Sequence, residues 1–333
     1  MIHISTETSN TLEETVFNKH HSITECDELR IVSGYVGPEP INKLNTLPFK
    51  SKVFYGMYGE AGIDPSLHKT ICAIDNSSAK ISVFYSKLKV HSKIYLWLNR
   101  GRVVSGLSGS ANFSNQGLLT LYREILSDLN AGDFRPVLKY ATKVANKSIS
   151  CFEHIARPRA LPSQETSVMP TACSLTLLNP STGEVHETHG LNWGQGTTNH
   201  TTRDDACIPI RVGHIRDYPD LFFPKPGYST SPGGRLQRQS DPIEVIFDDG
   251  FVMAGSMEGN NYPYPIDQGD QGPVYPKQLT SFPDKGTIGK YFRDRLSVPH
   301  GQPVRKHHLE SYGRKTIDFS VASEGVYKLD FSV

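Results

Sequence analysis

The chain has 333 residues, of which 37% are hydrophobic and 21% charged, with a formal net charge of +1 and a mean hydropathy of −0.39. This composition is typical of a globular protein and excludes collagen-like and disordered chains, and no window approaches the run of about 18 apolar residues that a transmembrane helix needs. The length exceeds that of one core of ordinary size, so we expect two domains.

The first 21 residues have no basic segment followed by an apolar one. We therefore expect a cytoplasmic protein without a secretion signal and without a membrane partner. The five cysteines are odd in number and contain no C-x-x-C pair, which favours free thiols in a reducing compartment. No His and Cys residues have the spacing of a zinc site, so we expect chemistry without a metal unless ligands from distant segments meet.

From residue 28 to residue 150, apolar strand-like runs alternate with helical patterns. This alternation predicts a mixed sheet flanked by helices, that is, an α/β domain. We expect strands within 28–36, 52–59, 80–86 and 118–129, a hairpin over 89–114, and helices over 65–76 and 136–149.

The segment 157–172 contains three prolines and no apolar periodicity, which is typical of a linker. After it, short strands alternate with long loops rich in Gly, Pro, Asn and Tyr, and one helix is expected near 284–296. This pattern predicts a β-rich barrel or pseudobarrel. The expected organisation is therefore a first domain over 1–156, a linker over 157–172 and a second domain over 173–333.

The predicted hairpin carries polar residues at its ends. Side chains two apart in a strand share a face, so His91 and Lys93 should point one way while Ile94, Leu96 and Leu98 form the core face of a half-buried strand. The return strand ends in Gly109-Ser110-Ala111-Asn112, beside the start of the first strand. We therefore expect His91, Lys93, Ser110 and Asn112 to converge.

This group lies in a segment without any acidic residue. Between Asp75 and Glu124 the chain has seven Lys and Arg residues and no Asp or Glu, a pattern that is often only a solvated strand face. Here, however, the lysine supplies charge, Ser and Asn supply donors for phosphate oxygens, and an imidazole can act as nucleophile. Glu124 is the next carboxylate and is suited to orient the ring of His91. The combination indicates phosphodiester chemistry.

At these residues the chain resembles the phospholipase D superfamily, whose signature is H-x-K followed by G-S-x-N. The resemblance implies that His91 forms a covalent phosphohistidine, that Lys93, Ser110 and Asn112 bind the phosphate, that Glu124 pairs with His91, and that no metal or other cofactor is needed. Leu98 stands at the position of the motif's Asp, and the segment from Lys93 to Gly109 is longer than usual.

Only one such half-motif occurs in the chain, whereas a working site of this superfamily uses two histidines. The resemblance therefore implies a homodimer formed through the nuclease domain, with one active site at the twofold axis containing His91 of both copies. Such a dimer would cut the two strands of DNA one after the other.

Over its full length the chain resembles the NgoFVII/NgoAVII-type restriction endonucleases, which join a PLD-like nuclease domain to a B3-like pseudobarrel. This resemblance rests on the domain order and on the segments "DDACIPI", "DDGFVMAGSMEGNN" and "PKQLTSF". It implies a sequence-specific endonuclease that acts on double-stranded DNA. Some systems of this kind include a separate ATPase or helicase-like subunit, which is a possible partner.

B3-like domains place two loops in the major groove, where side chains read base edges. We expect these loops over 192–205 and 258–275, although their polar residues also fit ordinary solvent-facing turns. Asp248-Asp249-Gly250 is expected to form a simple hairpin turn. The candidates for DNA contact are Trp193, Gln195, Asn199, Arg203, Asp204, Asp205, Asn260, Asn261, Gln268 and Asp270.

Two alternatives remain open. One is another enzyme of the same superfamily, such as a non-specific nuclease or a phospholipase, which random DNA cutting or lipid turnover would reveal. The other is a DNA-binding protein without catalysis, which site-specific binding without cleavage would reveal.

Overall fold

The computed structural model describes residues 1–6, 8–58, 63–154, 172–196, 201–228, 236–264 and 273–333. The chain divides into two compact units, Met1–Ser163 with Ala322–Val326, and Gln164–Val321 with Tyr327–Val333. The predicted linker over 157–172 lies outside the described residues, except for Ala172. Each unit is described here by itself.

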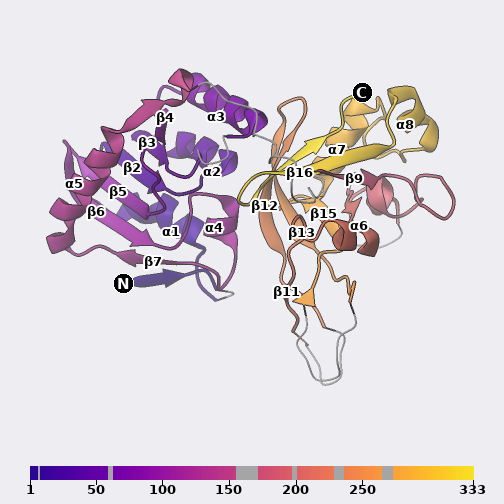
Figure 1. Ribbon diagram of the computed structural model, residues 1–333, viewed down its shortest axis with the longest axis horizontal. Coiled ribbons are helices and arrows are strands. Elements are labelled where there is room, and N and C mark those ends of the chain that lie inside the picture. Colours follow the sequence, from indigo (N-terminus) through magenta and orange to yellow (C-terminus); the bar gives the residue numbers. More distant parts are fainter. Residues whose placement is uncertain (7, 59–62, 155–171, 197–200, 229–235, 265–272) are drawn as a thin grey trace, which may run out of the picture. The chain divides into compact units, whose positions relative to one another are not determined.

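The first unit is built on an eight-stranded mixed sheet in the order β1-β7-β6-β5-β2-β3-β4-β8 (Figure 1). Strands β2, β3 and β4 are parallel to one another, and every other neighbouring pair is antiparallel. The strands are β1 (Ile2–Ile4), β2 (Glu28–Ser33), β3 (Lys50–Tyr55), β4 (Ile81–Ser86), β5 (Lys93–Asn99), β6 (Arg102–Gly109), β7 (Ile125–Asp128) and β8 (Ser148–Ser150).

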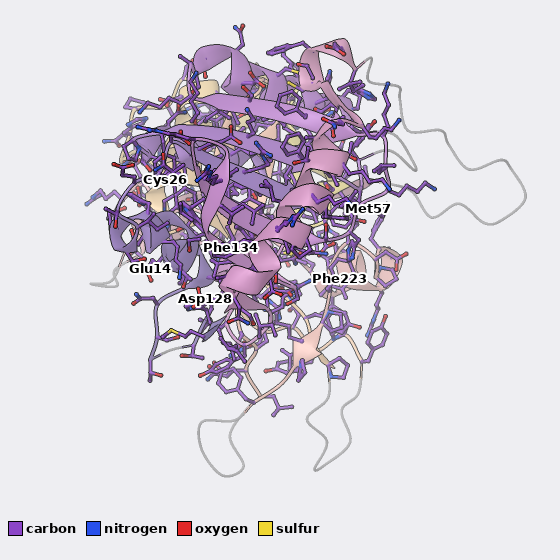
Figure 2. All side chains as sticks on the ribbon, turned by 90° about the vertical axis from the view of Figure 1, so that its left-hand side faces the viewer. Glu14, Cys26, Met57, Asp128, Phe134 and Phe223 are labelled. Carbon is purple, nitrogen blue, oxygen red and sulfur yellow. The ribbon has the colours of Figure 1, made fainter. Side chains whose placement is uncertain are left out.

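Helices cover this sheet. One face packs against α5, whose Ala141 and Val144 meet Ile94 and Leu96 of β5, and Figure 2, in which Phe134 marks the start of α5, shows the helix lying across the strands. The helices are α1 (Leu12–Asn18), α2 (Pro38–Lys43), α3 (Pro65–Ser77), α4 (Asn115–Leu119) and α5 (Phe134–Ala145), with 3₁₀ turns η1 (Lys19–Ser22), η2 (Leu44–Thr46), η3 (Ala131–Asp133) and η4 (Cys151–Glu153).

Two local expectations for this unit are wrong. Strand β5 is not half-buried, because α5 covers one face while Tyr95 on the other face packs against Phe113, and Lys93 through Leu98 are all buried. The strand expected within 118–129 begins only at Ile125, because Ser114 caps α4 by accepting a hydrogen bond from Gly117 N at 3.2 Å. Lys93 therefore lies on a central strand that is buried on both faces, and His91 lies two residues before that strand.

The second unit is a seven-stranded sheet in the order β10-β15-β13-β12-β17-β16-β9, with a separate pair β11-β14. Its two edge strands, β9 and β10, contact each other, so the sheet is nearly closed into a barrel, as the sequence predicts. The strands are β9 (Ala172–Thr176), β10 (Ile208–Pro209), β11 (Lys225–Pro226), β12 (Asp241–Phe247), β13 (Val252–Glu258), β14 (Pro273–Val274), β15 (Gln278–Ser281), β16 (Thr316–Ser323) and β17 (Val326–Asp330).

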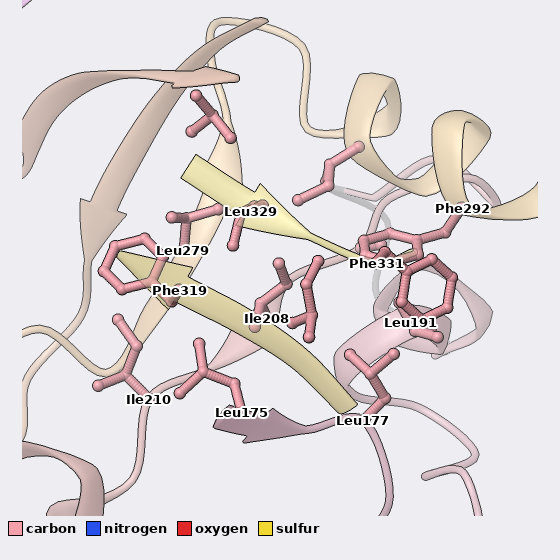
Figure 3. Packing of buried hydrophobic residues seen from close by; sticks show 14 of the residues in the cluster. Leu175, Leu177, Leu191, Ile208, Ile210, Leu279, Phe292, Phe319, Leu329 and Phe331 are labelled. Carbon is pink, nitrogen blue, oxygen red and sulfur yellow. The ribbon is translucent and has the colours of Figure 1, made fainter. Parts of the chain in front are cut away.

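One apolar core fills this barrel. Leu175, Ile208, Leu279, Phe319 and Leu329, each from a different strand, point into it (Figure 3). Its helices are α6 (Val212–Asp217), α7 (Gly286–Arg295), which is the expected helix near 284–296, and α8 (Lys306–Tyr312), together with the 3₁₀ segment η5 (Gly190–Gln195). All five cysteines of the chain are free thiols. In the described parts of the chain no helix is long and apolar enough to cross a membrane.

Candidate functional site

The β5-β6 hairpin brings the two halves of the motif together. Lys93 pairs with Gly109, and Gly109 in turn pairs with Leu126 of β7. The tight turn has positive φ angles at Arg100 and Gly101, and the register shifts after Trp97. This irregularity accommodates the longer hairpin while the G-S-x-N segment still returns to the start of β5.

His91 and Lys93 are in contact. The Nζ atom of Lys93 lies 3.1 Å from both Nδ1 and Nε2 of His91 and 2.7 Å from its backbone oxygen. Because it is equally far from both ring nitrogens, the ammonium is not in line with either one. Burial lowers the pKa of Lys93, while the negative charges of Glu324 and Glu124 act in the opposite direction. His91 itself is exposed, so its ring is open to a substrate.

Asn112 is oriented by the turn that follows β2. Its Oδ1 accepts a hydrogen bond from Tyr35 N at 3.1 Å, and Ser33 Oγ supports the same turn by accepting from Phe113 N at 2.9 Å. Among the described residues, the Nδ2 group of Asn112 has no hydrogen-bond acceptor. That donor is therefore available to a phosphate oxygen.

Ser110 is fixed on β7. Its amide donates to Ile125 O at 3.0 Å, and its Oγ accepts from Ile125 N at 3.0 Å, which leaves the hydroxyl proton for a ligand. A Cβ atom on Gly109 would lie 2.1 Å from Ile125 O, so only glycine fits there. The buried hydroxyl of Tyr95 stabilises the turn after Ser110 by donating a hydrogen bond to Ala111 O at 2.8 Å.

Glu124 lies near this group but does not touch its histidine. Its Oε1 is 3.3 Å from Arg123 Nε, and no hydrogen bond joins Glu124 to His91 in the described residues. Its charge nevertheless acts on Lys93, and it adds to burial in raising the pKa of Tyr95. The structure thus groups His91, Lys93, Ser110 and Asn112, with Glu124 beside them.

Sequence reasoning missed Gly34, which follows β2. A Cβ atom at this position would lie 2.9 Å from His91 Cδ2 and 3.4 Å from Asn112 Oδ1. The ring of Tyr35 also meets His91 edge-on, with 6.1 Å between ring centroids. The Ser-Gly-Tyr sequence after a buried strand was the available signal, but its contact lies 57 positions away in the chain.

Three of the six candidates in the first predicted DNA-contact loop hydrogen-bond within the protein through their side chains. Gln195 Nε2 donates to Arg203 O at 2.8 Å and to Gly301 O at 3.1 Å. Asp204 Oδ1 accepts from Gly301 N at 2.6 Å, and buried Asp205 accepts from a threonine hydroxyl at 2.5 Å. For these three side chains the structure supports the alternative role, which is to hold the loop in shape.

Two residues of the same loop are differently placed. Arg203 is exposed, and within the described residues its guanidinium has no protein partner, whereas Trp193 lies under Lys285, with Nζ 4.7 Å from the ring centroid. The loop is organised by Arg293, a fully buried residue that sequence reasoning missed. Its guanidinium donates to the backbone oxygens of Leu191 and Arg203, both at 3.3 Å, and its Nε lies 3.3 Å from Asp204 Oδ1.

In the second loop, Asn261 Nδ2 donates to Ile210 O at 2.7 Å and to Pro276 O at 2.9 Å, and Asn260 Oδ1 accepts from Arg238 N at 2.9 Å. Both asparagines therefore support the loop. The remaining candidates Asn199, Gln268 and Asp270 lie outside the described residues. The turn predicted at Asp248-Asp249-Gly250 is confirmed between β12 and β13, with a φ of 91° at Gly250.

Within the ranges that the structure describes, no group of three or more His, Cys, Asp or Glu side chains is arranged to hold a metal ion. His91 and the three residues grouped around it, Lys93, Ser110 and Asn112, offer a nucleophile, a cation and two neutral donors. This set can bind and attack a phosphodiester.

Comparison with known proteins bears on both units. The family model described as the NgoFVII restriction endonuclease N-terminal PLD domain matches residues 10–155, and the model described as the NgoFVII C-terminal B3-like DNA-binding domain matches residues 165–323. No curated protein matches the chain.

Two solved structures resemble the chain over part of its length. NucT from Helicobacter pylori is 13% identical, with a TM-score of 0.32, over 45% of this chain and 97% of that one. The phospholipase D family member Nuc from Salmonella typhimurium is 14% identical, with a TM-score of 0.33, over 45% and 95%. Because both domain models of a single family match in the order predicted from the sequence, the chain belongs to the NgoFVII restriction endonuclease family, as a nuclease with a DNA-binding domain.

Proposed function

We propose that the protein is a cytoplasmic, sequence-specific endonuclease that cuts double-stranded DNA without a metal. The observation that carries this proposal is the grouping of His91, Lys93, Ser110 and Asn112 in a segment that has no acidic residue. The B3-like domain supplies the DNA binding.

In the proposed reaction, a ring nitrogen of His91 attacks the phosphorus and the bond to the leaving 3′ oxygen breaks. The Lys93 ammonium, the Ser110 hydroxyl and the Asn112 amide stabilise the charge on the non-bridging oxygens. His91 of a second copy donates a proton to the leaving oxygen. Water then attacks the phosphohistidine, the same second histidine accepts its proton, and His91 is released.

The second histidine requires a homodimer, because each chain has one copy of the motif. The exposure of His91 supports this arrangement, since the ring is open to both a substrate and another copy. We also propose that Glu124 orients His91 in the assembled site. Since Glu124 contacts Arg123 in the single chain, it would have to exchange this partner for the imidazole.

Among the candidates for base contact, we propose Arg203 as the main one in the first loop, because its charged group is exposed and has no partner among the described residues. Arginine is suited to guanine, whose two major-groove acceptors it meets with two donors. Trp193, Gln195, Asp204, Asp205, Asn260 and Asn261 then act by shaping the loops.

The test is incubation of the wild type with a long plasmid in EDTA, followed by sequencing of fragment ends. The His91→Ala protein is compared with His21→Ala, which removes an exposed imidazole elsewhere in the same unit. We expect discrete ends from the wild type and from His21→Ala, and none from His91→Ala. Full cleavage by His91→Ala, or cleavage only with added magnesium, would contradict the mechanism. Random ends would contradict the specificity, and site-specific binding without any cutting would contradict catalysis.

A further inference from the structure

The second unit contains a hollow of about 440 Å³ that the nuclease mechanism does not use. It lies between the residues that follow β9, the start of η5, and the junction of β10 with α6. Its wall includes Leu177 and Ile210, which also belong to the apolar core (Figure 3). Because the core fixes these residues, the hollow is preformed, and its volume lies within the range of small-ligand sites, about 300–1,000 Å³.

Four basic side chains line this hollow: His186, His189, Arg211 and Lys277. Arg211 is held in place, since its Nη1 donates to Thr176 O at 3.3 Å and its Nη2 to Leu178 O at 2.9 Å. Lys277 is exposed, and in the described residues its ammonium has no protein partner. Its aliphatic stem crosses Gly259, where an added Cβ atom would lie 2.9 Å from the Cβ of Lys277.

The positive charge in the hollow is not balanced by its walls. No Asp or Glu occurs among its described lining residues. Glu258, on the neighbouring strand, is already paired with Lys285 at 2.7 Å. Burial is the main cause that lowers the pKa of His189, and the neighbouring basic groups of Lys277, His186 and Arg211 act in the same direction. The cations Lys277 and Arg211 therefore act on the same small volume, which favours an anion.

The position of the hollow relative to the predicted DNA-contact loops suggests what the anion is. Gly190, in its wall, lies two residues before the loop over 192–205. Asn261 and Lys277, also in its wall, lie within the loop over 258–275 and two residues after it. We propose that this hollow binds a nucleotide, with its phosphate on Lys277, Arg211 and His189 and its base against the apolar wall. The nucleotide belongs either to the bound duplex or to the free pool. This inference extends the proposed function but requires no cleavage step.

The first experiment uses free ligands. Inorganic phosphate and, separately, dAMP are titrated into full-length protein while the imidazole resonance of His189 is followed by NMR. We expect saturable binding and a rise in the pKa of His189, because a bound anion stabilises the imidazolium. Lys277→Ala should weaken binding about ten-fold, as expected for the loss of a charge-assisted hydrogen bond. Lys315→Ala, whose ammonium is already paired with Glu310 at 2.8 Å, is the control.

The second experiment uses duplex DNA. Binding of the His91→Ala protein to a cleavage-site duplex is measured over a range of salt concentrations, alone and combined with Lys277→Ala or with the control Lys315→Ala. If the phosphate belongs to DNA, removing one contact should reduce the slope of log K against log salt by about 1. Since Lys277 is exposed, its replacement should leave folding intact.

The results separate the possible outcomes. A changed salt slope assigns the hollow to a DNA nucleotide, and saturable binding of phosphate or dAMP with an unchanged slope assigns it to a free nucleotide. If Lys277→Ala behaves like Lys315→Ala in both experiments, the inference is wrong. If His91→Ala binds no DNA at all, the proposed function fails, while the phosphate titration still decides the inference.

Discussion

Replacement of Gly34 by alanine should slow DNA cleavage without preventing DNA binding. The added Cβ atom would lie 2.9 Å from His91 Cδ2, whereas carbon atoms in contact are normally about 3.5 Å or more apart. The backbone cannot easily yield, because Gly34 O accepts a hydrogen bond from Met57 N at 2.8 Å and Ser33 O accepts one from Gly56 N at 2.9 Å. The imidazole should therefore move by roughly half an ångström.

Misplacement of a reacting group by about 1 Å can reduce the rate about a hundred-fold, so we expect roughly a ten-fold loss in the rate of cleavage. The assay is single-turnover cleavage of a cognate duplex, with the affinity for the same duplex measured separately. Gly132→Ala is the matched control, because its Cβ atom would meet nothing within 4 Å. Equal cleavage rates for Gly34→Ala and Gly132→Ala would refute the reasoning. Equal losses in affinity and rate would show that the change acts on binding rather than on His91.

Three further predictions concern stability. Tyr95→Phe removes the donor to Ala111 O, so we expect a loss of about 1–3 kcal/mol in the free energy of unfolding, measured in urea; no change would show that this hydrogen bond is dispensable. Arg293→Met leaves several buried carbonyl oxygens without a donor, and a loss of about 3 kcal/mol is expected, with an undiminished urea midpoint as the contrary result. The Nζ atom of Lys19 lies 2.6 Å from Asp128 Oδ1. Burial alone would raise the pKa of Asp128, but the ion pair with Lys19 outweighs it and lowers this pKa below the ordinary value of 3.8. The folded state therefore binds fewer protons than the unfolded state near this pKa. Asp128→Asn should lower the free energy of unfolding by about 1 kcal/mol at neutral pH, and the difference between variant and wild type should vanish as the pH falls through the lowered pKa. A difference that persists in acid would contradict this linkage.

The grouping of His91 and Lys93 with Ser110 and Asn112 was predictable because its signal is local. A hairpin brings its two ends together whatever its length, so His91, two residues before β5, and Lys93 meet Ser110 and Asn112, which follow β6. The burial of both faces of β5 was not predictable from this segment, since it depends on α5 and on Phe113.

The DNA-contact loops show where local pattern is insufficient. A polar residue in a loop is equally suited to a turn and to a base edge, and the choice depends on partners that are far away in the sequence. Gln195 and Asp204 are engaged by Gly301, and Asn261 by Ile210. No regular spacing in the sequence links the two residues of any of these pairs, so only the folded structure reveals them. Gly34 was missed for the same reason.

The central claim is that His91 becomes covalently bonded to phosphorus. It is tested most directly by mixing the protein with cognate duplex in EDTA, quenching in alkali, in which phosphohistidine persists, and mapping the modified peptide by mass spectrometry. The account predicts a DNA adduct on the peptide that contains His91, present in the wild type and in His21→Ala and absent from His91→Ala. Cleavage by the wild type without any adduct, or with an adduct on a different residue, would contradict it.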